Sequence, residues 1–206
     1  MDGTKQGNIL FDFDGVMVNT FDACFRLTKK RYPAITEDGY RAHFEGNIYN
    51  VYRHDTKENA DFFSDYHAEL INHSIDEMVA GAIRTLSMEF ELFIVSSSAT
   101  NAIRSYLQMH KLDQVFAEIL GFDVEPSKVV KIKSILHDYQ IRPEHSMFVT
   151  DTLGDILEAR AASVQTVAVT WGFHPLATLQ KGDPYAIVNS PDELLHQLYG
   201  YFKKPL

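Results

Sequence analysis

Five short apolar runs, each soon followed by polar residues or glycine, constrain the fold of this chain more than any other feature. Such runs are typical of strands buried in a parallel sheet, because helices cover both faces of that sheet. The runs are residues 8–13 (NILFDF), 92–95 (LFIV), 116–120 (FAEIL), 146–149 (SMFV) and 166–169 (TVAV), and amphipathic stretches of helical length occupy 76–89, 100–110, 127–140 and 153–162. The alternation predicts an α/β fold with a parallel sheet covered on both sides.

One connection is far longer than a single crossover between parallel strands requires. Nearly 80 residues separate Asp14 from Leu92. Within them, residues 21–74 carry helical patterns and aromatic residues but few runs of Val or Ile. We therefore predict a core domain of residues 1–18 and 76–206, and an inserted helical domain of residues 19–75 over the carboxyl end of the first strand.

Polar side chains follow the predicted strands at their carboxyl ends, where open α/β sheets bind ligands. They are Asp12 and Asp14 at the end of the first run, Ser96 and Ser97 after the second, and Asp151 and Asp155 after the fourth. Each alone is also explained as a turn former or a helix cap, but their coincidence at one edge favours a site. Carboxylates ~4 Å apart repel by about 4 kcal/mol per pair at an effective dielectric constant of about 20, so the cluster needs protons or a cation. Oxygen ligands of this kind favour Mg²⁺.

The composition argues against several classes of partner. A formal net charge of −9 disfavours nucleic acid, because binding to a phosphate backbone needs a basic face. No apolar run approaches the roughly 20 residues of a membrane helix, and residues 1–8 lack the apolar centre of a signal peptide. Cys24 is the only cysteine, which excludes an intrachain disulfide and favours a reducing compartment. We expect a cytoplasmic enzyme that binds neither nucleic acid nor a membrane, with its oligomeric state left open.

Four short motifs occur in a fixed order along the chain. They are residues 12–16 (DFDGV), 93–96 (FIVS), Lys128 at a helix start, and 151–155 (DTLGD). Together they resemble the motifs of the haloacid dehalogenase superfamily, in the phosphatase-like branch of phosphoglycolate phosphatase and β-phosphoglucomutase, whose small helical cap follows the first motif. Residues 170–173 (TWGF) are similar to phosphoglycolate-phosphatase-like members. The resemblance implies a Rossmann-like parallel sheet core with helices on both faces and an inserted small α-helical cap domain.

The resemblance also implies a role for each motif residue. Asp12 is the nucleophile that attacks phosphorus, and Asp14 is the acid and base that serves the leaving group and then water. Mg²⁺ is held by the Asp12 carboxylate, the Asp14 backbone carbonyl and Asp151, with Asp155 in support. The phosphoryl oxygens are bound by Ser96, Lys128 and the backbone N–H of Ser97.

Several functions share these residues, and hydrolysis of a small phosphorylated metabolite through a phosphoryl-aspartate is the one we favour. A phosphomutase of the β-phosphoglucomutase type is the alternative, because it uses the same motifs. Asp14 argues against a dehalogenase, since halide needs no proton, and the long insertion argues against a phospho-accepting receiver domain. A phosphonate hydrolase needs an amine-forming lysine in the cap, for which Lys29, Lys30 and Lys57 are candidates by position.

Substrate specificity is expected from the inserted segment, and the sequence leaves the substrate open. The polar candidates there are Arg41, His43, Arg53, His54 and Lys57, and residues 44–52 are predicted to form a loop that enters the site. Among three lysines near one helix start, Lys128 is predicted to reach the phosphoryl group. Lys131 is expected a turn further from the site, Lys133 is expected to point elsewhere, and lysines in such a pattern ordinarily form a solvated face.

Overall fold

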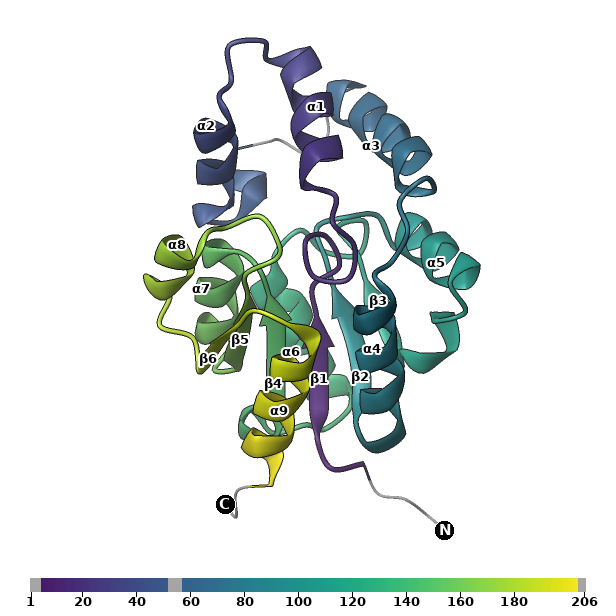
Figure 1. The fold of residues 1–206 in the computed structure, drawn as a ribbon, viewed down its shortest axis with the longest axis vertical. Coiled ribbons are helices and arrows are strands. Elements are labelled where there is room, and N and C mark those ends of the chain that lie inside the picture. Colours follow the sequence, from purple (N-terminus) through teal and green to yellow (C-terminus); the bar gives the residue numbers. More distant parts are fainter. Residues whose placement is uncertain (1–4, 52–56, 204–206) are drawn as a thin grey trace.

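The protein is built on a six-stranded parallel sheet, which lies in the lower half of Figure 1. The structure is a computed structural model that describes residues 5–51 and 57–203, without the side chains of residues 57–60. The strands are β1 (Asn8–Phe11), β2 (Glu91–Val95), β3 (Glu118–Leu120), β4 (Ser146–Thr150), β5 (Gln165–Val169) and β6 (Ala186–Val188). Their order is β3-β2-β1-β4-β5-β6, so β1 lies between β2 and β4. This arrangement confirms the predicted α/β class with a parallel sheet.

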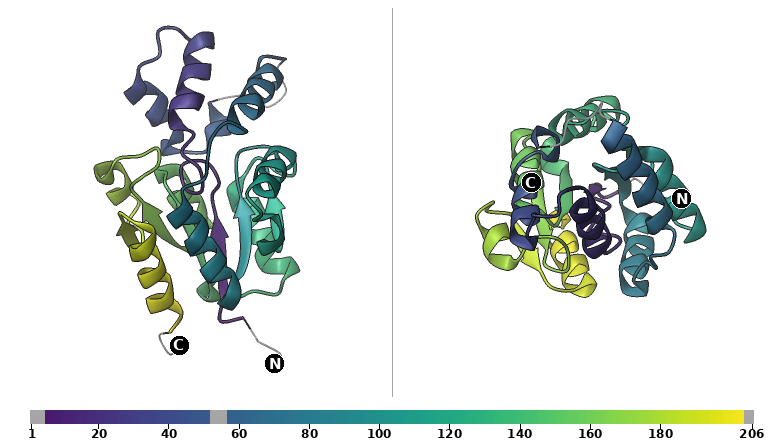
Figure 2. Two further views of the ribbon diagram at one scale, coloured as in Figure 1. Left: turned by 45° about the vertical axis from the view of Figure 1, so that its right-hand side comes forward. Right: turned by 90° about the horizontal axis from the view of Figure 1, so that it is seen from above.

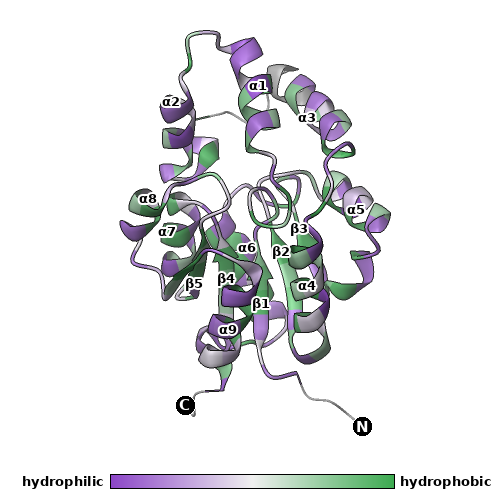
Figure 3. Ribbon diagram, viewed as in Figure 1, coloured by the Kyte–Doolittle hydropathy of each residue, from purple (hydrophilic) through white to green (hydrophobic). Residues whose placement is uncertain are grey.

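Alternation along the strands sends successive side chains to opposite faces. On one face, Ile9 and Phe11 join a core cluster with α4 (Glu77–Glu89), α5 (Thr100–Met109) and α9 (Pro191–Phe202). On the other face, Leu10 joins a second cluster with α6 (Lys128–Asp138) and α7 (Leu153–Ala161). The strands appear mostly hydrophobic in Figure 3, while the helices carry hydrophilic residues as well. Both faces of the sheet are thus covered, as the continuous apolar runs require.

The remaining elements are short or lie in the insertion. The core also carries α8 (Leu176–Gln180) and the 3₁₀ turns η3 (Asp113–Val115) and η4 (Pro143–His145). The five predicted runs all contain strands, but β6 is a sixth that the sequence pattern did not indicate, because it has three residues of which only Val188 is fully buried. The first run ends as a strand at Phe11 rather than Phe13, since the chain bends at Phe13 and turns at residues 15–17.

Residues 21–51 and 57–70 form a helical layer over the carboxyl ends of the strands, as Figures 1 and 2 show. It consists of α1 (Phe21–Arg31), α2 (Glu37–Ala42), η1 (His43–Glu45), η2 (Ile48–Asn50) and α3 (Lys57–Leu70). Ion pairs of Arg26 with Glu69 and of Arg31 with Asp65 join α1 to α3. Buried aromatic residues of this layer belong to the same hydrophobic cluster as Phe173 of the core. The division into core and cap domains at residues 19 and 75 stays a prediction.

Within the described ranges, no helix combines the length and the apolar character that a membrane crossing demands.

Candidate active site

The carboxyl end of β1 lies at the centre of the site because β1 is a central strand of the sheet. Asp12 directly follows β1 and is buried, and its Oδ1 accepts a hydrogen bond of 2.7 Å from the Phe13 N–H. Gly15 then turns the chain with a φ of +74°, a conformation that favours glycine. A Cβ on Gly15 would lie 1.9 Å from the Asp151 carboxylate, so glycine is required for this close approach.

Lys128 connects two of the carboxylates. Its Nζ lies 2.8 Å from Asp12 Oδ2 and 2.7 Å from Asp155 Oδ2. Ser127 caps the start of α6 by accepting from the Val130 N–H, which puts Lys128 in the first turn, facing the site. Burial works against the charge of Lys128, but the carboxylates of Asp12 and Asp155 outweigh it and raise the pKa of the ammonium. Lys128 is therefore charged throughout the physiological range.

Asp151 and Asp155 come from the end of β4 and the first turn of α7. Asp151 Oδ2 accepts a 2.6 Å hydrogen bond from the Phe173 N–H, whereas Oδ1 is buried without a hydrogen-bond partner among the residues that the structure describes. Burial raises the pKa of Asp151 to about 7. Asp155 is also buried, which by itself raises its pKa, but the Lys128 ammonium and the side-chain hydrogen bonds with Asp12, Lys128 and Thr150 together lower it. Burial raises the pKa of Asp12, which Lys128 only partly offsets.

The three carboxylates of Asp12, Asp151 and Asp155 fit a divalent cation. One oxygen atom from each lies within 4.8 Å of the others, and all three residues are buried. Among the described residues that line the cavity, Lys128 is the only lysine, and it contacts Asp12 and Asp155. The unpartnered Asp151 Oδ1 is the kind of orphaned acceptor that a metal ion satisfies, and an all-oxygen donor set suits a hard ion.

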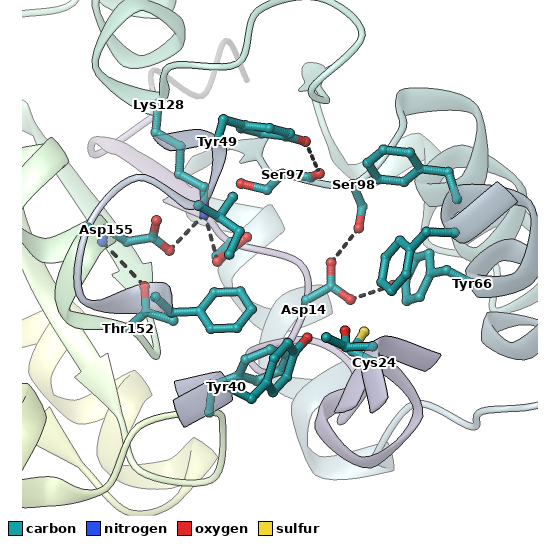
Figure 4. Close-up of a pocket in the computed structure, with 18 of the residues that line it drawn as sticks. Asp14, Cys24, Tyr40, Tyr49, Tyr66, Ser97, Ser98, Lys128, Thr152 and Asp155 are labelled. Carbon is teal, nitrogen blue, oxygen red and sulfur yellow. Dashed lines mark hydrogen bonds and ion pairs between the residues drawn. The ribbon is translucent and has the colours of Figure 1, made fainter. Parts of the chain in front are cut away.

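Asp14 has different surroundings from the other three aspartates. Its carboxylate accepts hydrogen bonds from Thr20 Oγ1 at 2.7 Å, from Ser98 Oγ at 2.6 Å and from the Tyr66 hydroxyl. Figure 4 shows Asp14 between Ser98 and Tyr66, facing the cavity. Sequence reasoning missed all three donors. Ser98 belongs to the run that closes β2, but nothing local marks Tyr66, which α3 brings from the inserted segment.

The serines after β2 do not all face the same space. Ser97 and Ser98 line the cavity, whereas Ser96 is fully buried and its Oγ accepts a 3.0 Å hydrogen bond from the Ser98 N–H. The Ser97 carbonyl accepts from the Tyr49 hydroxyl at 2.7 Å. The structure therefore brings Ser97 and Ser98 next to the aspartates and puts Ser96 beneath them.

Lys131 lies on the same side of α6 as Lys128 but contacts backbone carbonyls rather than the aspartates. Its side chain is buried, with 1% of the residue surface exposed, and its Nζ donates to the carbonyl oxygens of Ser96 and Gly121. Lys133 of the same helix is exposed. Lys128 and Lys131 lie on the side of α6 that packs on the sheet and Lys133 does not, so the ordinary pattern of a solvated lysine face holds for Lys133 alone among the three.

The inserted segment closes the site with aromatic side chains. Phe44, Gly46, Ile48 and Tyr49 line the cavity, as expected for a loop that enters the site. The Gly46 carbonyl is so close to the start of α7 that a Cβ on Gly154 would lie 2.4 Å from it.

The polar specificity candidates are placed elsewhere or not described. Arg41 stacks on Phe21, with its guanidinium 3.8 Å from the ring centroid, and pairs with Glu37. Neither Arg41 nor His43 is among the described residues that line the cavity. Arg53, His54 and the Lys57 side chain lie outside the description, as does residue 52 of the predicted loop.

His174 joins the core to the inserted segment. Its Nδ1 accepts from the Leu153 N–H at 2.9 Å, so the proton of the neutral ring is on Nε2, which lies 2.9 Å from the Arg41 carbonyl. Burial lowers the pKa of His174. The neutral His174 ring therefore links the start of α7 to α2 through two hydrogen bonds.

Comparisons with known proteins agree with this geometry. Residues 9–169 match the model of a family described as haloacid dehalogenase-like hydrolase. The chain is 25% identical to pyrophosphatase PpaX of Bacillus mycoides, over 93% of this chain and 96% of that protein. It is 22% identical to phosphoglycolate phosphatase of Vibrio parahaemolyticus, over 91% and 93% of the two chains.

Solved structures show the same fold. A predicted phosphatase from Clostridium acetobutylicum superposes with a TM-score of 0.79 at 20% identity, covering 96% of this chain and all (100%) of that one. A haloacid dehalogenase-like hydrolase from Streptococcus pneumoniae has a TM-score of 0.74 at 23% identity, covering 93% and 98%.

Proposed function

Since the chain belongs to the haloacid dehalogenase-like hydrolase family, we propose that it hydrolyses a small phosphomonoester through a phosphoryl-aspartate on Asp12. The chain is thus a hydrolase, and its relatives include proteins named as phosphatases. Their names concern pyrophosphate and phosphoglycolate, which supports a small phosphorylated compound as the substrate here. Cys24 is buried and forms no disulfide, which suits a cytoplasmic enzyme.

The observation that carries the proposal is the ion pair of Asp12 with Lys128. The carboxylates of Asp14 and Asp155 line the same cavity. A carboxylate is repelled by a phosphate ester unless cations neutralise both, so positioned positive charge is the main requirement of this reaction. Lys128 supplies one such charge, and its Nζ is held between Asp12 and Asp155. It would bind a phosphoryl oxygen as it releases one of these contacts.

The chain's own residues account for both steps. An oxygen of Asp12 forms the bond to phosphorus as the ester P–O bond breaks, and the Phe13 N–H holds the other carboxylate oxygen. Asp14 gives a proton to the departing alkoxide and then takes one from the water that hydrolyses the phosphoryl-aspartate. Ser97 and Ser98 line the cavity beside Lys128 and would contact the phosphoryl oxygens, with Ser96 beneath them.

Mg²⁺ would be held by Asp12, Asp151 and the Asp14 backbone carbonyl, with Asp155 in support, and when bound it would neutralise the carboxylate and phosphate oxygens. The orphaned Asp151 Oδ1 supports this assignment. Lys29 and Lys30 are exposed and are not among the described residues that line the cavity, so they offer no support for a phosphonate hydrolase.

The test is release of phosphate from acetyl phosphate and p-nitrophenyl phosphate with Mg²⁺, with excess chelator, and with two variants. Asp12→Asn is nearly isosteric and is expected to lose turnover while it keeps the circular dichroism spectrum of the parent. Asp192→Asn makes the same change at an exposed position of α9 and is expected to behave as the parent. Full activity of the Asp12→Asn variant, or undiminished turnover in chelator, would refute the proposal. Slow release from a long-lived phosphoryl-Asp12 would favour the mutase alternative.

A further inference from the structure

We propose that the preferred substrate is the phosphate ester of an uncharged alcohol that carries a ring, and that the cavity over Asp14 binds this ring. The inference rests on the proposed phosphatase function and specifies the part of the substrate that departs with the leaving oxygen. It is carried by the walls of the cavity, by its size and by the distribution of charge around it.

Aromatic rings from separate elements form most of the wall opposite the aspartates. They are Tyr40 of α2, Phe44 of η1, Tyr49 of η2, and Phe62, Phe63 and Tyr66 of α3. The cavity has a volume of about 130 Å³. That is close to the ~150 Å³ of an engineered apolar cavity that binds one benzene molecule. The space beside the aspartates therefore suits a single ring.

Two of the lining tyrosines have hydroxyl groups that are already bonded to the protein. The Tyr49 hydroxyl donates to the Ser97 carbonyl, and the Tyr66 hydroxyl donates to Asp14. Phe44, Phe62 and Phe63 are only partly buried although they line the cavity. Apolar surface is thus left for a ligand ring to cover, through the edge-to-face or offset contacts that aromatic pairs prefer.

Charge around the cavity disfavours a second anionic group on the substrate. Among the described residues that line it, the only cations are Lys128 and Arg31. Lys128 is already held by Asp12 and Asp155. Arg31 lies 3.3 Å from Asp65, donates to the Leu27 carbonyl and stacks on Phe62, with its guanidinium 5.3 Å from the ring centroid.

Carboxylates lie on the same walls. Asp14 and Glu158 both line the cavity, and burial raises the pKa of Glu158. The second phosphate of pyrophosphate and the carboxylate of phosphoglycolate would meet these groups without a free cation among the described lining residues. Like charges in a partly buried site repel strongly because water screens them poorly. An uncharged ring avoids that repulsion and gains the apolar contacts.

The experiment compares kcat/KM for benzyl phosphate, ethyl phosphate, 2-phosphoglycolate and pyrophosphate at one Mg²⁺ concentration. Benzyl and ethyl phosphate both release an alkyl alcohol, so their ratio reports mainly on binding of the ring. We expect benzyl phosphate to exceed each of the other three by about tenfold or more. Equal or higher kcat/KM for ethyl phosphate, phosphoglycolate or pyrophosphate would overturn the inference.

Two variants locate the effect. Phe63→Leu removes a ring from the wall, and we expect the benzyl-to-ethyl ratio to fall by about fivefold or more. Phe25→Leu makes the same change in the inserted segment at a residue outside the cavity lining, and the ratio is expected to stay as in the parent. An unchanged ratio in Phe63→Leu contradicts binding of the ring at this wall.

Acetyl phosphate separates this inference from the function on which it rests. It is small, reactive and free of a ring. If acetyl phosphate is hydrolysed in an Asp12-dependent reaction while benzyl phosphate shows no advantage, the substrate class alone is wrong. If acetyl phosphate and all four other compounds stay intact, the phosphatase function is refuted and the substrate class with it.

Discussion

Replacing Lys131 with methionine is expected to change how the stability of the protein depends on pH. Burial, the largest cause, and the nearby Lys128 ammonium together lower the pKa of Lys131 from an ordinary 10.5 to about 7. Between these values the unfolded chain binds a proton that the folded chain does not. Above the ordinary pKa of 10.5 the amine is neutral in both states, and its burial costs no stability. As the pH falls from there toward 7, the free energy of unfolding therefore decreases.

The size of the effect follows from proton linkage. One pH unit within this window changes the free energy of unfolding by about 1.4 kcal/mol per proton, so a change from about pH 7 to about pH 9 adds at most ~3 kcal/mol. The carbonyls of Ser96 and Gly121 favour the charged ammonium and reduce this value. We expect the wild type to gain about 1–3 kcal/mol relative to Lys131→Met over this range.

The assay is urea unfolding in excess chelator at several pH values, followed by circular dichroism and by the fluorescence of Trp171, the only tryptophan. Methionine is chosen because it keeps most of the volume of the lysine stem and so avoids a cavity. Lys133→Met is the matched control, since Lys133 is exposed on the same helix. Parallel stability curves for wild type and Lys131→Met would refute the reasoning, because Lys131 would then be charged in the folded protein throughout.

Three further predictions concern the site. Lys128→Ala is expected to lower kcat/KM by about 100-fold or more in steady-state assays, against little change for Lys133→Ala, because Lys128 neutralises charge next to Asp12 and Lys133 is exposed; equal losses would contradict this assignment. Tyr66→Phe removes a donor to Asp14, so kcat is expected to fall more for ethyl phosphate than for p-nitrophenyl phosphate, whose leaving group needs no proton, and equal losses would indicate a merely structural role. Burial lowers the pKa of His174, so stability is expected to fall as the pH drops below the ordinary value of about 6.5, and His174→Gln should flatten this slope in thermal unfolding, whereas an unchanged slope would show that His174 is not the titrating group.

The strands and the aspartates were predictable because their signals are local. The run 92–95 is apolar throughout since both faces of the sheet are covered, Asp12 directly follows β1, and Asp151 directly follows β4. The cap residue Ser127 likewise marks the start of the helix that carries Lys128. β6 left no such signal, because an edge strand of three residues with one buried side chain does not produce a pattern.

The sequence by itself determined the alternation of the first five strands with helices, the long segment after the first strand and the convergence of carboxylates at one edge of the sheet. These follow from periodicity and from the rule that parallel strands end on the same side. Only the tertiary structure decided which donors hold Asp14, because Tyr66 reaches it from 52 positions along the chain. It also decided that Lys131 is buried and Lys133 is not, since spacing along a helix limits which residues share a face but does not say which face packs on the sheet. Contacts between distant segments depend on how the helical layer packs on the core. That packing is determined by side chains from separate parts of the sequence, and no local sequence pattern relates them to one another.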